Sequence, residues 1–192
     1  MGRVWEAPAG SSILVSVLLR PPREHQATEL TLVAGVATAI VVERATGLAA
    51  QIKWPNDVML DRRKVAGGLA ELKDGAVVLG IGLNVKQGPG ELPVETRTPS
   101  GSLRSVTGRV LERGPILADL LLELEQRYDA WRDGGLDAIY DDVGARDFLR
   151  GRRVTVDGAE GTAQMITRDG RLEISTDSGP VLVESGEVLF ER

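Results

Sequence analysis

The chain has 192 residues, a formal net charge of −5 and no cysteine. This length can bury a good core and hold one large domain, or a medium domain and a small one. The acidic balance argues against a general nucleic-acid binder, and the lack of Cys excludes disulfides and thiolate chemistry. With His25 as its single histidine, the chain has little scope for a Ser-His-Asp site or a histidine-rich metal site. No apolar run approaches the ~20 residues that span a bilayer, and no hydrophobic signal core opens the chain, so we expect a cytoplasmic enzyme.

The first elements in chain order are a strand and a helix. Residues 12–20, SILVSVLLR, form an apolar run between Gly10 and a Pro-Pro pair, which is typical of a buried strand. From Gln26 to Thr46 apolar residues recur at intervals of three and four, which predicts an amphipathic helix that Gly47 ends.

The next stretch, residues 53–68 (KWPNDVMLDRRKVAGG), predicts strand, kink, strand, turn and strand, because a Pro-Asn-Asp turn interrupts two β-prone runs. Its last strand extends over 64–73, and Asp74-Gly75 then makes a tight turn into the strand 76–86. Glycine accepts the positive φ that such hairpin turns require.

Three charged side chains of this stretch are expected near one mouth of the sheet: Lys53, Asp57 and Lys64. Two cations suit an anionic substrate, and an Asp between them suits a magnesium ion shared with phosphate. The alternative for each is structural: the lysines are then solvated strand ends, and Asp57 caps the turn.

The two strands of the expected hairpin share an unusual number of glycines, namely Gly67, Gly68, Gly80 and Gly82. Because glycine weakens a strand, several together indicate close approach of a ligand or of another backbone. For any one of them a bulge or tight packing is as good an explanation, but glycines that face each other favour a ligand slot.

The second half of the chain predicts a long loop over residues 87–114, with a short helix near Leu103, and then a helix from Pro115 to a Gly-Gly pair at 134–135. A shorter helix is expected over Leu136–Val143. The apolar stripe expected to face the core on the longer helix consists of Leu117, Leu120, Leu121, Leu124, Tyr128 and Trp131.

From about Phe148 five short alternating strands follow, separated by DG, RDG, DSG and ESG turns, which predicts a small antiparallel barrel. We therefore expect an α+β protein with a domain boundary that separates residues 1–146 from residues 147–192.

Three motifs, in this order and ahead of a helix and a small C-terminal barrel, resemble the catalytic core of biotin protein ligases: KWPND at 53–57, DRRKVAGGLAEL at 61–72 and GIGLNV at 80–85. The resemblance runs through essentially the whole chain. It implies a class II synthetase-like biotin/lipoate ligase fold, with a mixed or antiparallel sheet and helices on one side, followed by an SH3-like β-barrel.

The resemblance also implies an activity. Biotin and ATP would form biotinyl-5′-AMP with the help of Mg²⁺, and a lysine of a biotin carboxyl carrier protein, part of an acyl-CoA carboxylase, would then accept biotin. Such a chemistry needs cations that neutralise two mutually repelling anions. The resemblance assigns the catalytic positions to Lys64, Lys53 and Asp57, and the metal to Asp57 and Asn84. Without the family, Asn84 would satisfy backbone groups at a strand end.

For the substrates, the resemblance implies a slot for biotin and contacts with the nucleotide. Gly67, Leu69, Gly80 and Gly82 would form the slot, and Lys64 and Asn84 would also contact the substrates. Arg3 would contact the nucleotide, and Trp5 would pack beside adenine or close the site.

The sequence departs from the family at its start, since the family core begins upstream of Met1. The first strand, the Ser/Thr-rich biotin contacts and half of the glycine-arginine loop that excludes water are then missing, so we expect an N-terminally truncated form with weak or no carrier biotinylation. No DNA-binding or membrane role is expected, and monomer and homodimer stay open. The alternatives are a non-catalytic biotin-binding or regulatory fragment and a lipoate-type ligase.

Overall fold

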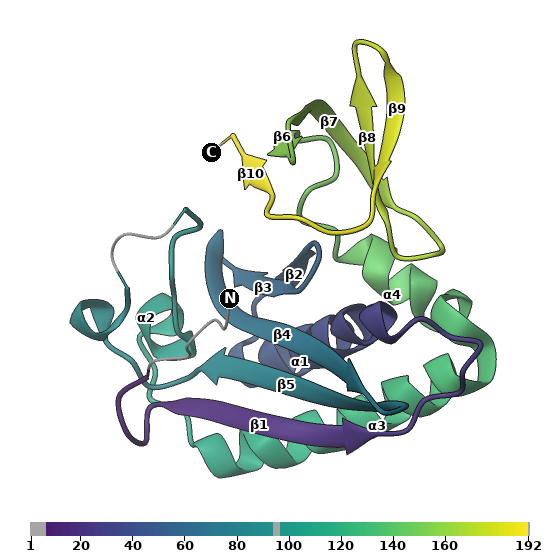
Figure 1. The fold of residues 1–192 in the computed structure, drawn as a ribbon. Coiled ribbons are helices and arrows are strands. Elements are labelled where there is room, and N and C mark those ends of the chain that lie inside the picture. The colour runs from purple at the N-terminus through teal and green to yellow at the C-terminus, as the bar shows by residue number, and fades with distance from the viewer. Residues whose placement is uncertain (1–6, 94–96, 192) are drawn as a thin grey trace.

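The computed structural model describes residues 7–93 and 97–191. In these residues two five-stranded antiparallel sheets lie one above the other, and helices cover one side of the first sheet (Figure 1). The α+β class expected from the sequence is therefore confirmed.

The first sheet is built around the hairpin expected at Asp74-Gly75. Both turn residues have positive φ, 52° and 77°, and they join two long strands that pair from Lys73 opposite Ala76 onwards. In spatial order the sheet contains β1 (Ser12–Leu19), β5 (Ala76–Asn84), β4 (Arg63–Lys73), β3 (Asp57–Leu60) and β2 (Ala50–Lys53).

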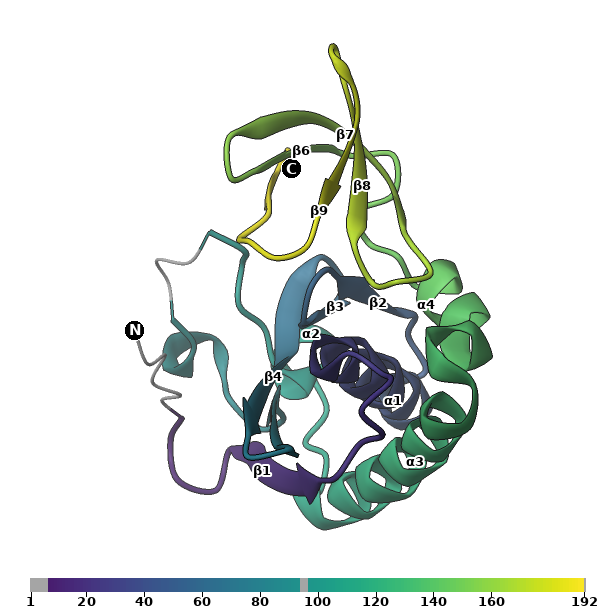
Figure 2. The same cartoon turned by 45° about the vertical axis from the view of Figure 1, so that its right-hand side comes forward.

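The first helix, α1 (Leu30–Thr46), follows the 3₁₀ turn η1 (Ala27–Glu29) and ends at Gly47, whose φ of 78° is left-handed. The expected amphipathic character is wrong, because 13 of the 17 helix residues are buried. The helix lies between the first sheet and the long helix α3 (Arg113–Gly134), so it is covered on most sides (Figure 2). Residues 31–42 contain no charged side chain, as expected of a helix that is covered on most sides.

The remaining helical segments are η2 (Pro89–Glu91), α2 (Leu103–Thr107), η3 (Gly135–Ile139) and α4 (Tyr140–Ala145).

On α3 the expected stripe is partly wrong: Leu120, Leu124 and Trp131 are buried, whereas Leu121 is 41% exposed and Ile116 is buried in addition. The buried stripe thus runs through 116, 120 and 124, one helix row away from 117 and 121.

Strand β1 was expected to be buried, and this is wrong as well. Its residues alternate between covered and open positions, and Leu14 and Leu18 are each 56% exposed. The reason is its place at the edge of a sheet whose helices lie on one side only (Figure 2). We call the side of this sheet away from α1 the open face.

The second sheet contains the five strands expected after Phe148, in the order β10 (Leu189–Phe190), β6 (Arg153–Val156), β7 (Ala159–Ile166), β8 (Leu172–Thr176) and β9 (Gly179–Val183). Among the described residues β10 pairs only with β6 and β9 only with β8. The strands therefore form an open antiparallel sheet, and a closed barrel is not observed.

The chain between the two sheets also extends the first one. The backbone N–H of Ile52 donates to Arg146 O (2.7 Å), the N–H of Phe148 donates to Ile52 O (2.9 Å), and Asp147 forms a parallel bridge with Ile52. Trp54 Nε1 donates to Gly170 O in the second sheet's β7–β8 turn (2.8 Å). The second sheet is thus attached to the strand that carries Lys53, and the division at 146/147 stays a prediction.

Within the described ranges, no helix combines the length and apolar character that a membrane span needs.

Candidate functional site

The two faces of strand β5 carry different chemistry, because side chains in a strand alternate. Towards α1 point four buried apolar side chains: Val77, Leu79, Ile81 and Leu83. The residues between them belong to the open face: Val78, Gly80, Gly82 and Asn84.

The strand register brings the expected slot residues onto this open face. Gly82 lies opposite Gly67, and Gly80 lies opposite Leu69. On the other side of β5, Gly82 lies opposite Leu14 of β1. Five residues from three strands are thus neighbours in two adjacent rows.

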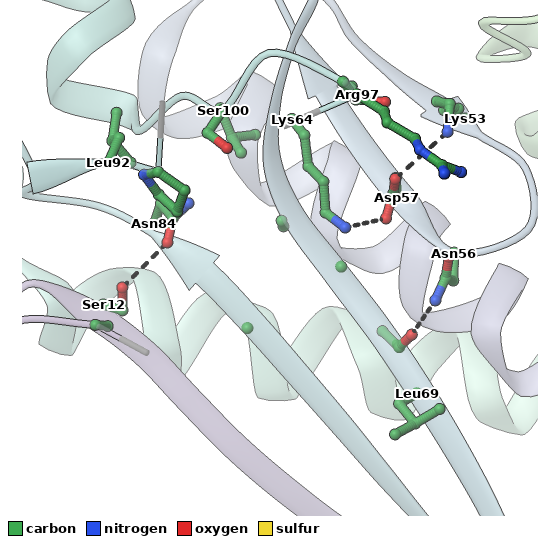
Figure 3. A pocket seen from close by; sticks show the side chains of 18 of the residues that line it. Ser12, Lys53, Asn56, Asp57, Lys64, Leu69, Asn84, Leu92, Arg97 and Ser100 are labelled. Carbon is green, nitrogen blue, oxygen red and sulfur yellow. Dashed lines mark hydrogen bonds and ion pairs between the residues drawn. The ribbon is translucent and has the colours of Figure 1, made fainter. Parts of the chain in front are cut away.

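A cavity of about 1000 Å³ opens over this face (Figure 3). It is lined by most of the residues that the sequence singled out: Lys53, Asp57, Lys64, Gly67, Leu69, Gly82 and Asn84. Gly80 lies in the row below and does not line the cavity itself. Arg3 and Trp5 lie outside the described residues, so the nucleotide contacts assigned to them stay predictions.

Two lysines share one carboxylate in the wall of the cavity. Lys64 Nζ lies 2.5 Å from Asp57 Oδ1, and Lys53 Nζ lies 3.7 Å from Asp57 Oδ2 (Figure 3). Lys53 is only 4% exposed, whereas the side chain of Lys64 is 38% exposed. Burial lowers the pKa of Lys53, and the negative charge of Asp57 opposes that shift. Of the two lysines, Lys64 is therefore the one that an entering anion meets, and Lys53 lies behind it.

The local sequence explains how this cluster forms. Lys53 ends β2 and pairs with Asp57, which begins β3, so the Trp54-Pro55-Asn56 segment is the link between them. Asn56 Nδ2 donates to Gly68 O (2.7 Å), and the N–H of Gly68 donates to Asn56 O (2.9 Å), which joins the link to β4.

Gly67 is the position where a side chain would disturb this ion pair. A Cβ placed there would lie 3.4 Å from Asp57 Oδ1 and 3.4 Å from Lys64 Nζ. A bulge in the pairing of β3 and β4 puts Lys64 opposite Met59 while Gly67 stays opposite Asp57. Lys64 therefore folds back over Gly67 to reach the carboxylate.

Asn84 belongs to a hydrogen-bonded cluster that the sequence did not reveal. Its Oδ1 accepts from Ser12 Oγ (3.2 Å) and from Gln87 Nε2 (2.9 Å), and its Nδ2 donates to Gly101 O (3.0 Å). Ser12 and Gln87 also line the cavity. Both are ordinary polar residues in the sequence, and only the pairing of β1 with β5 and the path of the loop bring them together.

These contacts bear on the expected metal position. Both carboxylate oxygens of Asp57 face ammonium groups, and Asn84 Oδ1 already accepts two hydrogen bonds. The described part of the chain holds no group of three or more His, Cys, Asp or Glu side chains suited to a metal ion. The two residues do not fit a magnesium site while these contacts persist, so the assignment of magnesium to Asp57 and Asn84 stays a prediction, and we assign no step to it.

The second sheet supplies part of the cavity rim. Gly186, Glu187 and Val188 line the cavity, and Arg97 Nη1 lies 2.6 Å from Glu187 Oε2. Lys53 Nζ lies 5.7 Å from the centre of the Phe190 ring. No local pattern predicted these contacts, because they join residues that are 90 or more positions apart.

Comparison with known proteins gives a consistent picture. The sequence profile described as "Biotin/lipoate A/B protein ligase family" matches residues 1–87. The biotin–[acetyl-CoA-carboxylase] ligase of Mycobacterium tuberculosis is 36% identical over 205 residues, which cover 100% of this chain and 74% of that protein. The bifunctional ligase/repressor BirA of Bacillus subtilis is 35% identical over 145 residues, or 72% of this chain; the match spans only 45% of BirA, less than half its length.

Among solved structures, the biotin protein ligase from Aquifex aeolicus in complex with biotin and ATP superposes with a TM-score of 0.85 at 26% sequence identity. The match covers 95% of this chain and 79% of that one. The fold described above is thus shared with a protein whose structure contains both biotin and ATP.

Proposed function

This chain belongs to the biotin protein ligase family, and on that premise we propose that it links biotin to a lysine of a carrier protein at the expense of ATP. The observation that carries the proposal is the Lys53–Asp57–Lys64 cluster in the wall of a cavity whose floor contains facing glycines. An apolar slot that ends at cations suits a ligand with an apolar body and a carboxylate, such as biotin.

The proposed reaction has two steps. The carboxylate of biotin attacks the α-phosphorus of ATP, so that a carboxyl–phosphate bond forms and pyrophosphate leaves with the electrons of the broken P–O bond. A carrier lysine amine then attacks the carbonyl carbon of biotinyl-5′-AMP, an amide forms, and AMP leaves. Both reactants of the first step are anions, so the chain must offset their repulsion and hold them in line.

We assign that task to Lys64, because it is the more exposed of the two lysines and lies at the end of the slot. Lys53 adds positive charge from behind, and Asp57 holds both ammonium groups in place. An ion pair at 2.5 Å fixes the Lys64 amine before substrate enters, which reduces the ordering needed on binding.

The slot itself is proposed to hold the ring system and chain of biotin. On the open face Leu14 lies beside Gly82, and Leu69 lies in the next row opposite Gly80, so apolar side chains border two sides of a strip without side chains. The family profile includes lipoate ligases, but the Mycobacterium tuberculosis relative and the Aquifex aeolicus structure described above are biotin ligases by name, which favours biotin over lipoate.

Several further assignments are part of the proposal. The acceptor is the biotin carboxyl carrier protein of an acyl-CoA carboxylase, and the location is the cytoplasm. We infer that residues 147–192 are an SH3-like module, because five short antiparallel strands follow one another over this range.

The experiment uses the 192-residue chain and the protein encoded by its full reading frame. Each is incubated with ATP, Mg²⁺ and either biotin or lipoate, pyrophosphate release is recorded, and the acyl-adenylate that forms is identified by mass spectrometry. A purified biotin carboxyl carrier domain is then added and biotin transfer is read on an avidin blot. We expect adenylate formation and biotin transfer from the protein encoded by the full reading frame, and the 192-residue chain shows how much of both reactions the described site performs. Adenylate from lipoate but not biotin would overturn the substrate, and adenylate from neither would overturn the function.

A further inference from the structure

Gln87 is a buried amide in the cavity wall that the proposed reaction does not use directly. The residue is 2% exposed and lies three positions after the end of β5. Its Nε2 donates to Ser12 Oγ and to Asn84 Oδ1, whereas its Oε1 is buried and has no hydrogen-bond partner among the described residues. A buried amide with one oxygen unpaired is costly, so its placement needs a reason.

The orientation of this amide follows from a backbone group. Gly101 O is a carbonyl and can only accept, so Asn84 must turn its Nδ2 towards it (3.0 Å). The Oδ1 of Asn84 then faces Gln87, and only the Nε2 of Gln87 can bond to it (2.9 Å). The reverse orientation of Gln87 would set two acceptors against each other. The directions of both amides are therefore determined by the loop that contains Gly101.

The same loop holds the backbone of Lys64. The N–H of Lys64 donates to Pro99 O (2.8 Å), and the N–H of Gly101 donates to Lys64 O (2.8 Å). The approach is close, since a Cβ at Gly101 would lie 2.7 Å from Arg63 Cβ. A continuous chain of hydrogen bonds thus runs from Gln87 through Asn84 and Gly101 to the lysine that faces the cavity.

We propose that Gln87 is a positioning residue, which holds the Asn84 amide against Gly101 O and through Gly101 supports the backbone of Lys64. Its own main chain is held separately, because Ser102 Oγ donates to Gln87 O (2.6 Å). Changing the side chain therefore removes the amide bonds while the segment stays in place. The kinetic consequence rests on the ligase function proposed above, whereas the structural consequence does not.

Two variants test this role. Gln87→Leu keeps a similar volume and removes both donors. Gln87→Glu presents only acceptors when it is ionised, but its protonated form can donate to Asn84 Oδ1 again. Burial raises the pKa of such a carboxyl. Charged groups nearby are Arg113, which donates to Ser12 O, Arg104, which donates to Lys86 O, and Lys86, which pairs with Glu112. Gln164→Leu, at an exposed position of β7, is the matched control.

Hydrogen exchange is measured at the backbone amides of Lys64 and Gly101, and the rate of biotinyl-5′-AMP formation is measured across pH. For Gln87→Leu we expect exchange at both amides to be about tenfold faster and adenylate formation to be about tenfold slower. A tenfold change is the size expected for the loss of one net hydrogen bond. Thermal stability should change little. Gln87→Glu should recover towards wild type as pH falls, each rate being compared with wild type at the same pH, whereas Gln87→Leu should not. The control should match wild type throughout.

Unchanged exchange at Lys64 and Gly101 in Gln87→Leu would overturn the proposal, and so would identical pH profiles for the two Gln87 variants. If wild type itself forms no adenylate, the ligase function fails, but the exchange rates still decide whether Gln87 supports Lys64.

Discussion

The two faces of the first sheet use the same strands for opposite purposes. On the helix side of β5, Leu79 and its neighbours Val77, Ile81 and Leu83 are almost completely buried. On the open face the same strand presents glycines, an asparagine and the exposed Val78. Residues next to each other in sequence thus belong to the core or to the cavity, depending only on the two-residue period of the strand.

This contrast indicates how sequence changes divide between stability and activity. A substitution on the helix side leaves a gap in packed side chains, whereas one on the open face changes a surface that a ligand covers. Stability and substrate handling should therefore respond separately to changes one residue apart.

The largest effect is expected on the open face, from Lys64→Ala. Removing the cation that meets both anions should slow adenylate formation by at least about 10²–10³-fold, or roughly 3–4 kcal/mol of transition-state stabilisation. Asp57 keeps Lys53 as a partner, so the free energy of unfolding should change by less than about 1 kcal/mol. Pyrophosphate release and urea unfolding measure the two quantities. Lys73→Ala, at the exposed far end of β4, is the control. Normal pyrophosphate release by Lys64→Ala would contradict the role given to Lys64.

On the helix side, Leu79→Ala should cost about 3 kcal/mol of unfolding free energy, because it leaves a cavity in a site with no exposed surface. Its neighbour Val78 is 41% exposed on the open face, so Val78→Ala should cost less than about 1 kcal/mol. Urea unfolding compares the two variants directly. Equal costs would mean that the two faces are not as different as their burial indicates.

A smaller effect is expected from Gly67→Ala, which adds a methyl group 3.4 Å from the Lys64 amine and from Asp57 Oδ1. The lysine end must move, so we expect the KM for biotin to rise about tenfold, or about 1.4 kcal/mol, with little change in stability. Gly114→Ala is the matched control, because a Cβ there meets nothing within 4 Å and the position lies in the first turn of α3. An unaltered KM in Gly67→Ala would argue against a slot at this position.

The smallest effect concerns pH and Lys53. Burial lowers the pKa of Lys53, so its positive charge is lost at a lower pH than that of a free lysine. Adenylate formation should therefore fall a few-fold as pH rises towards the ordinary lysine range, and Lys53→Met, although slower, should lack this alkaline decline. The same shift affects stability, because the unfolded chain binds the Lys53 proton more tightly than the folded chain does. Below the lowered pKa the buried charge therefore reduces the free energy of unfolding, and this cost should diminish as pH rises towards the ordinary lysine range. Rate–pH profiles and urea unfolding at each pH measure both effects. The same alkaline decline in both proteins would assign it to another group.

Much of the fold could be predicted because it depends on local signals. The Asp74-Gly75 turn, the end of α1 at Gly47 and the five C-terminal strands each follow from glycine conformation and strand alternation. The predictions that were wrong concern burial: α1 is covered on most sides, and β1 is half open. Which face of an element is covered depends on partners that are distant in sequence.

The candidate site divides in the same way. Lys53, Asp57 and Lys64 lie within twelve residues, so motif spacing was enough to group them, and the structure places all three in one cavity. Gln87 and Ser12 carry no motif, and their contact with Asn84 depends on the pairing of β1 with β5.

The sequence by itself thus determined the order of strands and turns and the residue types that meet anions, because hairpin geometry and charge spacing act over a few positions. Only the tertiary structure decided which side of each strand is core and which is cavity. It also decided that each carboxylate oxygen of Asp57 pairs with a different lysine and that the open face ends in a cluster of amides. Those outcomes depend on sheet register and on helix coverage, which connect residues tens of positions apart.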